Sequence, residues 1–128
     1  MKKPNLPAGH QQMVPYFLVN DADVFITFLK NVLGAKDREM HRDGTGHVRH
    51  AELTIGNAVL MIGQSRDQWK AQSSMNYLYV TDIDATHRAC LAAGCTERYP
   101  PSDHEYGVRG SGIQDNWGNT WWLAQPNE

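Results

Sequence analysis

The stretch "GHVRHAELTIG", residues 46–56, contains three side chains of the types that bind metal ions in proteins. Imidazole and carboxylate groups are common ligands of zinc and iron, so His47, His50 and Glu52 suggest half of a metal site. Side chains alternate between the two faces of a strand, which places His50 and Glu52 on one face and His47 on the other. The three side chains therefore cannot converge on one ion without a bulge.

Three interpretations of His50 and Glu52 stay open at this point. They form a polar pair lining a ligand-binding cup, they hydrogen-bond neighbouring strands or a dimer edge, or they supply two ligands to a metal. We favour the first, because Ala51, Leu53 and Ile55 provide an apolar face for a helix. His50, Glu52 and Thr54 then face away from that helix.

The elements that must position these residues occur twice in the chain. The segment "VPYFLVNDADVFITFLKNVLGA" from Val14 is similar to "MNYLYVTDIDATHRACLAAGC" from Met75. Each begins with a short apolar strand that ends in Val-x-Asp-x-Asp, where an aspartate can cap the helix that follows. The helices close at Gly34 and Gly94, which predicts helices near residues 22–33 and 83–93.

The ends of the two halves also match, because "IGNAVLMIGQ" at 55–64 is similar to "WGNTWWLAQ" at 117–125. On that match Leu60 corresponds to Trp122. Two further strands are expected in each half, at 36–42, 47–55, 96–100 and 107–114. We predict an α+β fold of two tandem β-α-β-β-β modules that form an open cup-shaped mixed β-sheet. Its expected parts are a loose tail (1–12) and a single domain (13–128), which contains the two modules (13–64 and 75–125) and the linker between them (65–74).

This pattern resembles the glyoxalase / bleomycin-resistance / extradiol-dioxygenase superfamily, the vicinal oxygen chelate proteins. The resemblance covers residues 13–125 and is carried by "FLVNDADVFITFLKNVLGA", "VRHAELTIGNAVLMIG" and "IQDNWGNTWWLA". The last is similar to the family's Asp-Pro-x-Gly-Asn/His-x-Trp ending, with Asn116 in place of proline. The resemblance implies paired modules and a homodimer.

The resemblance also indicates where a metal would be bound. Metal-dependent members take four ligands from the first and last strand of each half, and these positions correspond here to Val14, Leu60, Met75 and Trp122. None of them is a ligand for zinc, nickel, iron or manganese, so we expect a member without the metal site and without a cofactor. For Leu60 to lie beside Glu52, the turn at 55–57 must have three residues or a bulge.

Members without the metal resemble the bleomycin-resistance type, which binds planar, aromatic or cationic molecules. We therefore expect a metal-independent small-molecule binding protein, with aromatic walls and a carboxylate that offsets positive charge. Its expected ligand-binding residues are Tyr16, His50, Glu52, Leu60, Tyr77, Tyr79, Gln114 and Trp122. The alternatives are a lyase or isomerase with His50 and Glu52 as acid and base, and a ligand-free scaffold homodimer.

Other residues of these types have plainer interpretations. Trp121 and Trp122 are neighbours on one strand, so their side chains point to opposite faces, and Trp121 is expected in the core. The alternative is that all the aromatic residues belong to the core. Solvated or structural roles are expected for His41, His87 and His104. Cys90 and Cys95 match neither a redox nor a zinc motif, so inert thiols are expected.

Composition excludes several classes of protein. The formal net charge of −2 and the scattered Lys and Arg residues argue against nucleic-acid binding. No apolar run approaches the roughly 18 residues of a membrane span. The N-terminal "MKKPNLPAGHQQ" has no apolar stretch behind its lysines, so no signal peptide is expected and the protein is placed in the cytoplasm.

Overall fold

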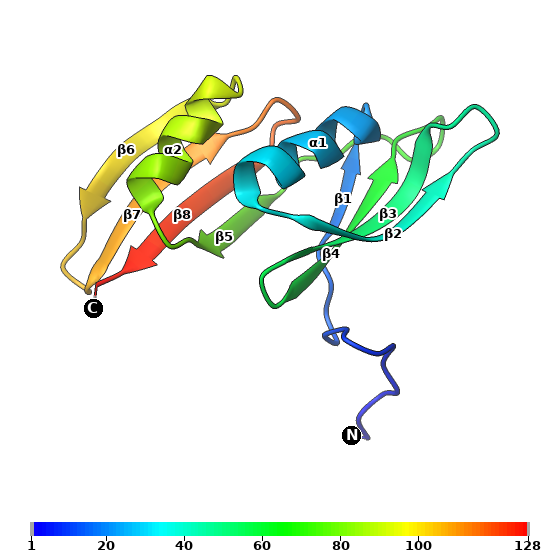
Figure 1. The fold of residues 1–128 in the computed structure, drawn as a ribbon, viewed down its shortest axis with the longest axis horizontal. Helices are drawn as coiled ribbons and strands as arrows, with labels where there is room; N and C mark the ends of the chain where they lie inside the picture. The colour runs from blue at the N-terminus through cyan, green and yellow to red at the C-terminus, as the bar shows by residue number, and fades with distance from the viewer. Residues whose placement is uncertain (1, 128) are drawn as a thin grey trace. The chain divides into compact units, whose positions relative to one another are not determined.

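The structure is a computed structural model that describes residues 2–127. The chain divides into two compact units, the first ending at Gln72 and the second beginning at Ser73. Each unit contains one helix and one four-stranded mixed sheet (Figure 1). The predicted α+β class and the two tandem β-α-β-β-β modules are confirmed.

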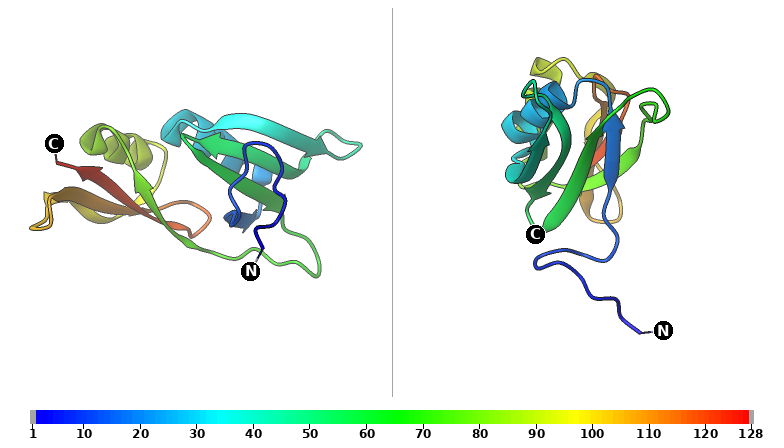
Figure 2. Two further views of the ribbon diagram at one scale, coloured as in Figure 1. Left: turned by 90° about the horizontal axis from the view of Figure 1, so that it is seen from below. Right: turned by 90° about the vertical axis from the view of Figure 1, so that its right-hand side faces the viewer.

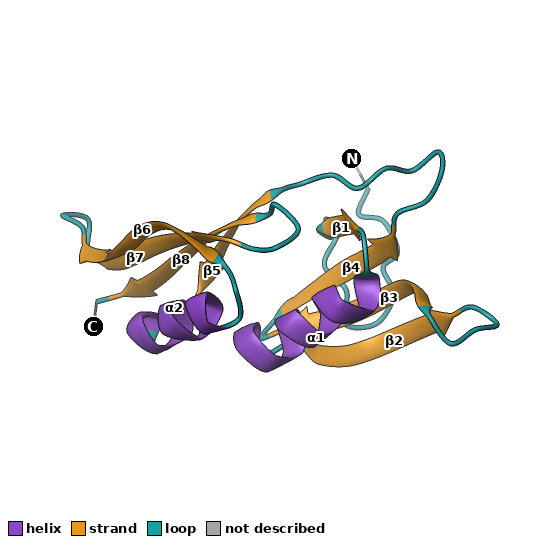
Figure 3. Cartoon of the chain, turned by 90° about the horizontal axis from the view of Figure 1, so that it is seen from above, coloured by secondary structure: helices purple, strands orange, loops and turns teal. Residues whose placement is uncertain are grey.

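Unit 1 has its helix on one face of its sheet (Figure 3). Its elements are β1 (Tyr16–Val19), α1 (Ala22–Leu33), β2 (Lys36–Arg42), β3 (Val48–Ile55) and β4 (Ala58–Gln64). The strand order is β1-β4-β3-β2, with β1 parallel to β4 and the other pairs antiparallel. Phe25 and Leu29 of α1 are fully buried together with Ala51, Leu53 and Ile62 of the sheet. Helical spacing on one side and strand alternation on the other therefore build this core.

Unit 2 repeats this plan with the strand order β5-β8-β7-β6. Its elements are β5 (Met75–Tyr79), α2 (Ile83–Ala92), β6 (Thr96–Asp103), β7 (Val108–Gln114) and β8 (Thr120–Pro126). Ile83 and Cys90 of α2 are buried with Ile113, Trp121 and Leu123 of the sheet. The expectation that Trp121 belongs to the core is confirmed, and its indole N–H donates to Asp115 at 2.8 Å. Neither helix of residues 2–127 is long and apolar enough to cross a membrane.

A glutamine at the end of the last strand caps the helix in each unit. Gln64 accepts a hydrogen bond from the amide of Ala22 at 2.8 Å, and Gln125 accepts one from Ile83 at 2.9 Å. Asp82 also caps α2 as expected, through the amide of Ala85 at 3.1 Å. The expected side-chain cap of α1 by Asp21 or Asp23 is absent, because Asp21 has φ 59° and forms no such bond. The carboxylate of Asp23 instead accepts from Arg42 and from the amide of Val48.

The turn between β3 and β4 differs from the expected one. Ile55 pairs with Ala58, so the turn has two central residues, and Gly56 supplies the positive φ of 56°. The predicted three-residue or bulged turn at 55–57 is therefore wrong. A one-residue difference in the turn reverses which side chains share a face.

The N-terminal segment is less loose than expected. The side chain of Gln11 donates to the carbonyl of Val59 at 2.7 Å and accepts from its amide at 3.2 Å, as a neighbouring strand would. Figure 2 shows the N-terminal segment leading out from the end of β1, with its far end away from the unit 1 strands. In the expected linker 65–74, the amides of Ser65 and Gln72 donate to carbonyls of β1, so most of this segment is attached to unit 1.

Candidate functional site

The sheet face of unit 2 that points away from α2 is aromatic, and we call it the aromatic face. Strand pairing aligns Tyr99, Gly112, Trp122 and Tyr77 in one row across β6, β7, β8 and β5. The neighbouring rows are Ser102, Gly110, Ala124 and Tyr79 on one side, and Thr96, Gln114, Thr120 and Met75 on the other. None of these twelve positions carries a charged side chain at neutral pH. Of the expected ligand-binding residues, the register places Tyr77, Tyr79, Gln114 and Trp122 on this face. Tyr16, which was expected beside them, lies on β1 of unit 1.

Trp122 stacks on Tyr99, with ring centroids 5.9 Å apart and an interplanar angle of 27°. Gly112 lies beneath the pair, and a Cβ atom there would come within 2.7 Å of the indole and 3.1 Å of the phenol ring. The glycine therefore lets two rings lie flat on the sheet. Sequence reasoning missed Tyr99 as a site residue, although its strand was predicted.

A second ring pair continues the aromatic face. His104 stacks on Tyr106 with centroids 5.2 Å apart and planes 7° apart, and it meets Tyr99 edge-on at 6.3 Å. Its Nε2 atom is buried over Gly110 without a hydrogen-bond partner among the described residues. His104 and Tyr106 lie in the β6–β7 hairpin, where the sequence showed no periodicity that would place them on this face.

The tyrosines at the edge of the aromatic face remain accessible. Tyr77 and Tyr79 are 54% and 64% exposed and pack edge to face at 5.3 Å. The pKa of Tyr77 is raised, chiefly by desolvation and to a smaller extent by the neighbouring tyrosines. The pKa of Tyr99 is also raised, chiefly by desolvation and to a smaller extent by Tyr106. Both phenols therefore stay protonated at neutral pH, and the three strand rows carry no charge.

The corresponding face of unit 1 is polar, and we call it the open face. Glu52 pairs with Met61, which pairs with Tyr16, while His50 pairs with Gly63. Leu60 instead pairs with Leu53, is 6% exposed and faces the core. The expectation that Leu60 lies beside Glu52 is therefore wrong, because the two-residue turn shifts the register by one. Met61 is the residue that corresponds to Trp122.

His50 and Glu52 share a face as expected, but each bonds to a different residue. The ring of His50 lies 5.8 Å from that of Tyr16, whose hydroxyl is 3.4 Å from its Nδ1 atom. Glu52 accepts from His10 at 2.8 Å and from Arg38 at 3.2 Å. His50 and Glu52 are not hydrogen-bonded to each other, and the imidazole on Glu52 comes from the N-terminal segment.

His87 belongs to a chain of hydrogen bonds beneath α2. Its Nε2 atom donates to Glu97 at 2.8 Å, so a neutral imidazole accepts from the Ser111 hydroxyl at Nδ1, 2.9 Å away. The three residue types are those of a hydrolase triad, but Ser111 is fully buried. No substrate reaches that hydroxyl in this packing, so the network is structural, one of the two roles expected for His87.

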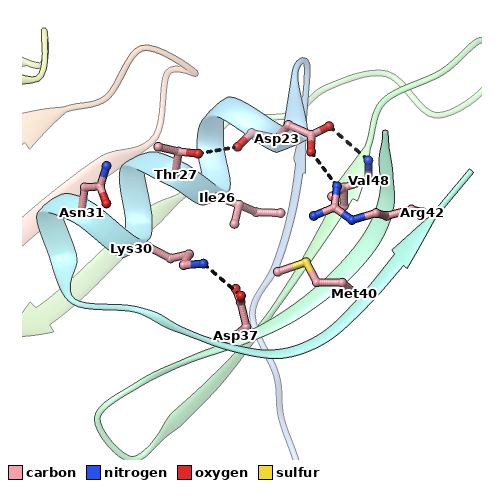
Figure 4. A pocket seen from close by; sticks show the side chains of 9 residues that line it. All are labelled: Asp23, Ile26, Thr27, Lys30, Asn31, Asp37, Met40, Arg42 and Val48. Atoms are coloured by element: carbon pink, nitrogen blue, oxygen red, sulfur yellow. Dashed lines mark hydrogen bonds and ion pairs between the residues drawn. The ribbon is translucent and has the colours of Figure 1, made fainter. Parts of the chain in front are cut away.

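A crevice of about 240 Å³ lies in unit 1 between α1 and β2 (Figure 4). Its apolar lining comes from Ile26, Met40 and Val48. Two ion pairs cross its rim, Lys30 with Asp37 at 2.9 Å and Arg42 with Asp23 at 3.2 Å. Because each charge already has a partner, the crevice offers a ligand no free ionic group. Within residues 2–127, no three His, Cys, Asp or Glu side chains are grouped so that they hold a metal ion.

Sequence comparison identifies the family. Residues 11–123 match the model of the Glyoxalase/Bleomycin resistance protein/Dioxygenase superfamily. The chain belongs to this superfamily. An uncharacterized protein of Mycobacterium tuberculosis (strain H37Rv), Rv0887c, is 27% identical over 146 aligned positions, which cover 96% of this chain and 86% of that protein.

Solved structures show the same superfamily fold. TioX from Micromonospora sp. ML1 has a TM-score of 0.77 at 22% identity, covering 91% of this chain and 98% of TioX. Protein PA1353 from Pseudomonas aeruginosa has a TM-score of 0.74 at 18% identity, covering 92% of this chain and 99% of PA1353. The fosfomycin resistance protein FosX from Mesorhizobium loti has a TM-score of 0.67 at 18% identity, covering 91% of this chain and 92% of FosX. At these identities the likeness concerns the fold alone.

Proposed function

We propose that this superfamily member is a metal-independent small-molecule binding protein that holds a planar or cationic ligand. The observation that supports the proposal most is the row of Tyr99, Gly112, Trp122 and Tyr77 on the aromatic face. A planar molecule on this row would exchange water for ring stacking, and a cation would also interact with the ring faces. Sequestration or resistance is the role that such binding serves.

The three rows contain no Asp, Glu, His, Lys or Arg side chain, which favours binding over catalysis at these positions. Acid–base chemistry needs a group that exchanges protons near neutral pH, and the protonated phenols of Tyr77 and Tyr99 do not. The alternatives remain a lyase or isomerase and a ligand-free scaffold.

Two planar probes and one non-aromatic control compound test the proposal. Acridine is a planar molecule that is neutral at pH 7.5, 9-aminoacridine is its cationic analogue, and cyclohexylamine is a cation without a ring to stack. We expect both acridines to raise the melting temperature and quench indole fluorescence, the cation more strongly, and cyclohexylamine to do neither. NMR shifts at Tyr77, Tyr99 and Trp122 should locate the binding. The proposal is wrong if neither acridine binds, or if binding shifts only unit 1 resonances.

A further inference from the structure

A second feature of the structure lies on the open face of unit 1, where the chain covers its own carboxylate. Glu52 and His10 have side chains only 10% and 7% exposed, and their hydrogen bond is 2.8 Å long. A carboxylate with this little access to water needs hydrogen-bond donors around it. Two groups provide them, the His10 imidazole and the Arg38 guanidinium.

Arg38 connects Glu52 to the backbone of the same segment. Its Nε atom donates to Glu52 at 3.2 Å, and its Nη2 atom donates to the carbonyl oxygen of Ala8. The segment thus presents two groups together, a ring N–H to the carboxylate and a carbonyl oxygen to the guanidinium. Gly9, at φ 77°, provides the backbone turn between them.

The segment itself is held mainly by polar contacts. Residues 8 and 9 are exposed, Leu6 is 44% exposed and Met13 is 87% exposed. Among the described residues, a further attachment is the pair of hydrogen bonds between the Gln11 side chain and the backbone of Val59. Each such hydrogen bond contributes about 0.5–1.5 kcal/mol net to holding the segment in place. A ligand that forms equivalent bonds can therefore displace it.

We propose that residues 8–11 are a displaceable strap over a binding site made by Glu52 and Arg38. The class of ligand is a small heterocycle that carries a ring N–H donor beside a carbonyl or similar acceptor. Such a molecule reproduces the two contacts of His10 and Ala8, and Tyr16 and Met61 lie in the same strand row as Glu52. The proposal concerns unit 1 alone and does not depend on binding at the aromatic face.

The strap makes a quantitative prediction about affinity. If it is docked at least roughly 90% of the time, the apparent affinity of the site in the intact chain is lowered about tenfold or more. Removing the imidazole while keeping the full chain should therefore create a site that free imidazole fills.

The test uses the full-length His10→Ala variant with imidazole as the probe. His41→Ala is the matched control, because His41 lies on a neighbouring strand with its side chain 62% exposed and contacts neither Glu52 nor the strap. Its described neighbours are Glu39, at 3.5 Å, and the His50 ring, with centroids 5.9 Å apart. Imidazole should raise the melting temperature of His10→Ala by several degrees at saturation, as binding to the folded state requires. Half-saturation should need at least tenfold more imidazole in the wild type and in His41→Ala.

The carboxylate is tested by adding Glu52→Gln to His10→Ala, which should abolish the response. An equal response in the wild type, His10→Ala and His41→Ala, or an undiminished response in the double variant, would overturn the proposal. If His10→Ala does not fold, wild-type protein is titrated with imidazole and amide exchange of Val59 is followed. Faster exchange at that amide is expected when the strap leaves, and unchanged exchange up to saturating imidazole counts against displacement.

Discussion

Trp122 and Tyr99 lie on strands that are not neighbours, yet their rings stack with centroids 5.9 Å apart. β7 separates their strands, and it contributes Gly112 to the row between them. The missing side chain is what allows the two rings to meet above β7.

Replacing Trp122 with alanine should weaken binding of a planar ligand. Stacking on an indole contributes about 0.5–1.5 kcal/mol beyond the buried area, which is a several-fold to about tenfold loss of affinity. Trp121→Ala should instead destabilise the protein by roughly 3–5 kcal/mol, because Trp121 is core. Titration with 9-aminoacridine and urea denaturation separate the two effects. The opposite pattern would place the ligand elsewhere.

Gly112→Ala should disturb the aromatic face without removing a ring. The new Cβ atom would lie 2.7 Å from the indole and 2.9 Å from a second indole carbon, so Trp122 must tilt away from the sheet. We expect altered indole fluorescence and at least a few-fold weaker binding. Gly44→Ala is the control, since nothing lies within 4 Å of its Cβ. Unchanged fluorescence in Gly112→Ala would show that the rings are not held as described.

Ser111→Ala should destabilise unit 2. The substitution removes the hydroxyl that is hydrogen-bonded to His87 and leaves the buried Nδ1 atom without this partner, at a cost of about 1–3 kcal/mol. Ser102→Ala, at an exposed position of β6, should change stability by less than about 0.5 kcal/mol. Urea denaturation measures both. Equal stability of the two variants would mean that the buried hydrogen bond contributes nothing net.

Arg109→Lys should raise the pKa of Asp84. Arg109 donates two hydrogen bonds to this carboxylate, at 2.9 and 3.1 Å, and they are the largest cause that holds the pKa of Asp84 below its usual range. Lysine cannot form the two-pronged contact. NMR titration of the carboxyl carbon measures the change, with Asp43, whose pKa is lowered chiefly by Thr45, as the control.

The sign of this effect on stability follows from linkage. Because the pKa of Asp84 is lowered on folding, its contribution is present above the unfolded value of about 3.9 and lost as pH falls through the folded value. In Arg109→Lys the free energy of unfolding should therefore fall less steeply as the pH is lowered through the acid range. An unchanged pKa of Asp84 would contradict the role assigned to Arg109.

Chelators should leave the melting temperature unchanged. The positions taken by ligands in metal-dependent relatives correspond to Val14, Met61, Met75 and Trp122 once the register is corrected, and these do not bind zinc, nickel, iron or manganese. A metal that stabilised the fold would link its removal to melting. Elemental analysis that finds about one metal ion per chain would refute this expectation.

Much of the fold could be predicted because its signals are local. Helix spacing between Phe25 and Leu29, the left-handed glycine at Gly34 and the Val-x-Asp strand ends lie within a few residues of the elements that they define. Alternation along one strand likewise separated Trp121 from Trp122. Such periodicities do not depend on which strand is the neighbour.

The register of β4 against β3 required the tertiary structure, because it depends on one turn. A Gly-Asn pair precedes the last strand in both halves, but the loops that contain it differ in length. In unit 1 the turn between β3 and β4 has two residues, whereas in unit 2 a five-residue loop separates Gln114 from its partner Thr120. Aligning the halves at Gly-Asn therefore assigned Leu60 to the face that Met61 occupies. Aligning them at Gln64 and Gln125, which cap equivalent helices, would have found the correct residue.

The sequence by itself determined the two modules, their helices and the faces of single strands, since each follows from contacts between near neighbours in the chain. Only the tertiary structure decided that His10 reaches Glu52, 42 residues away, and that Tyr99, His104 and Trp122 share one face. Most of these contacts join segments that are far apart in the chain, and the local periodicity of the sequence carries no information about such contacts. Strand pairing and the path of the N-terminal segment bring them together.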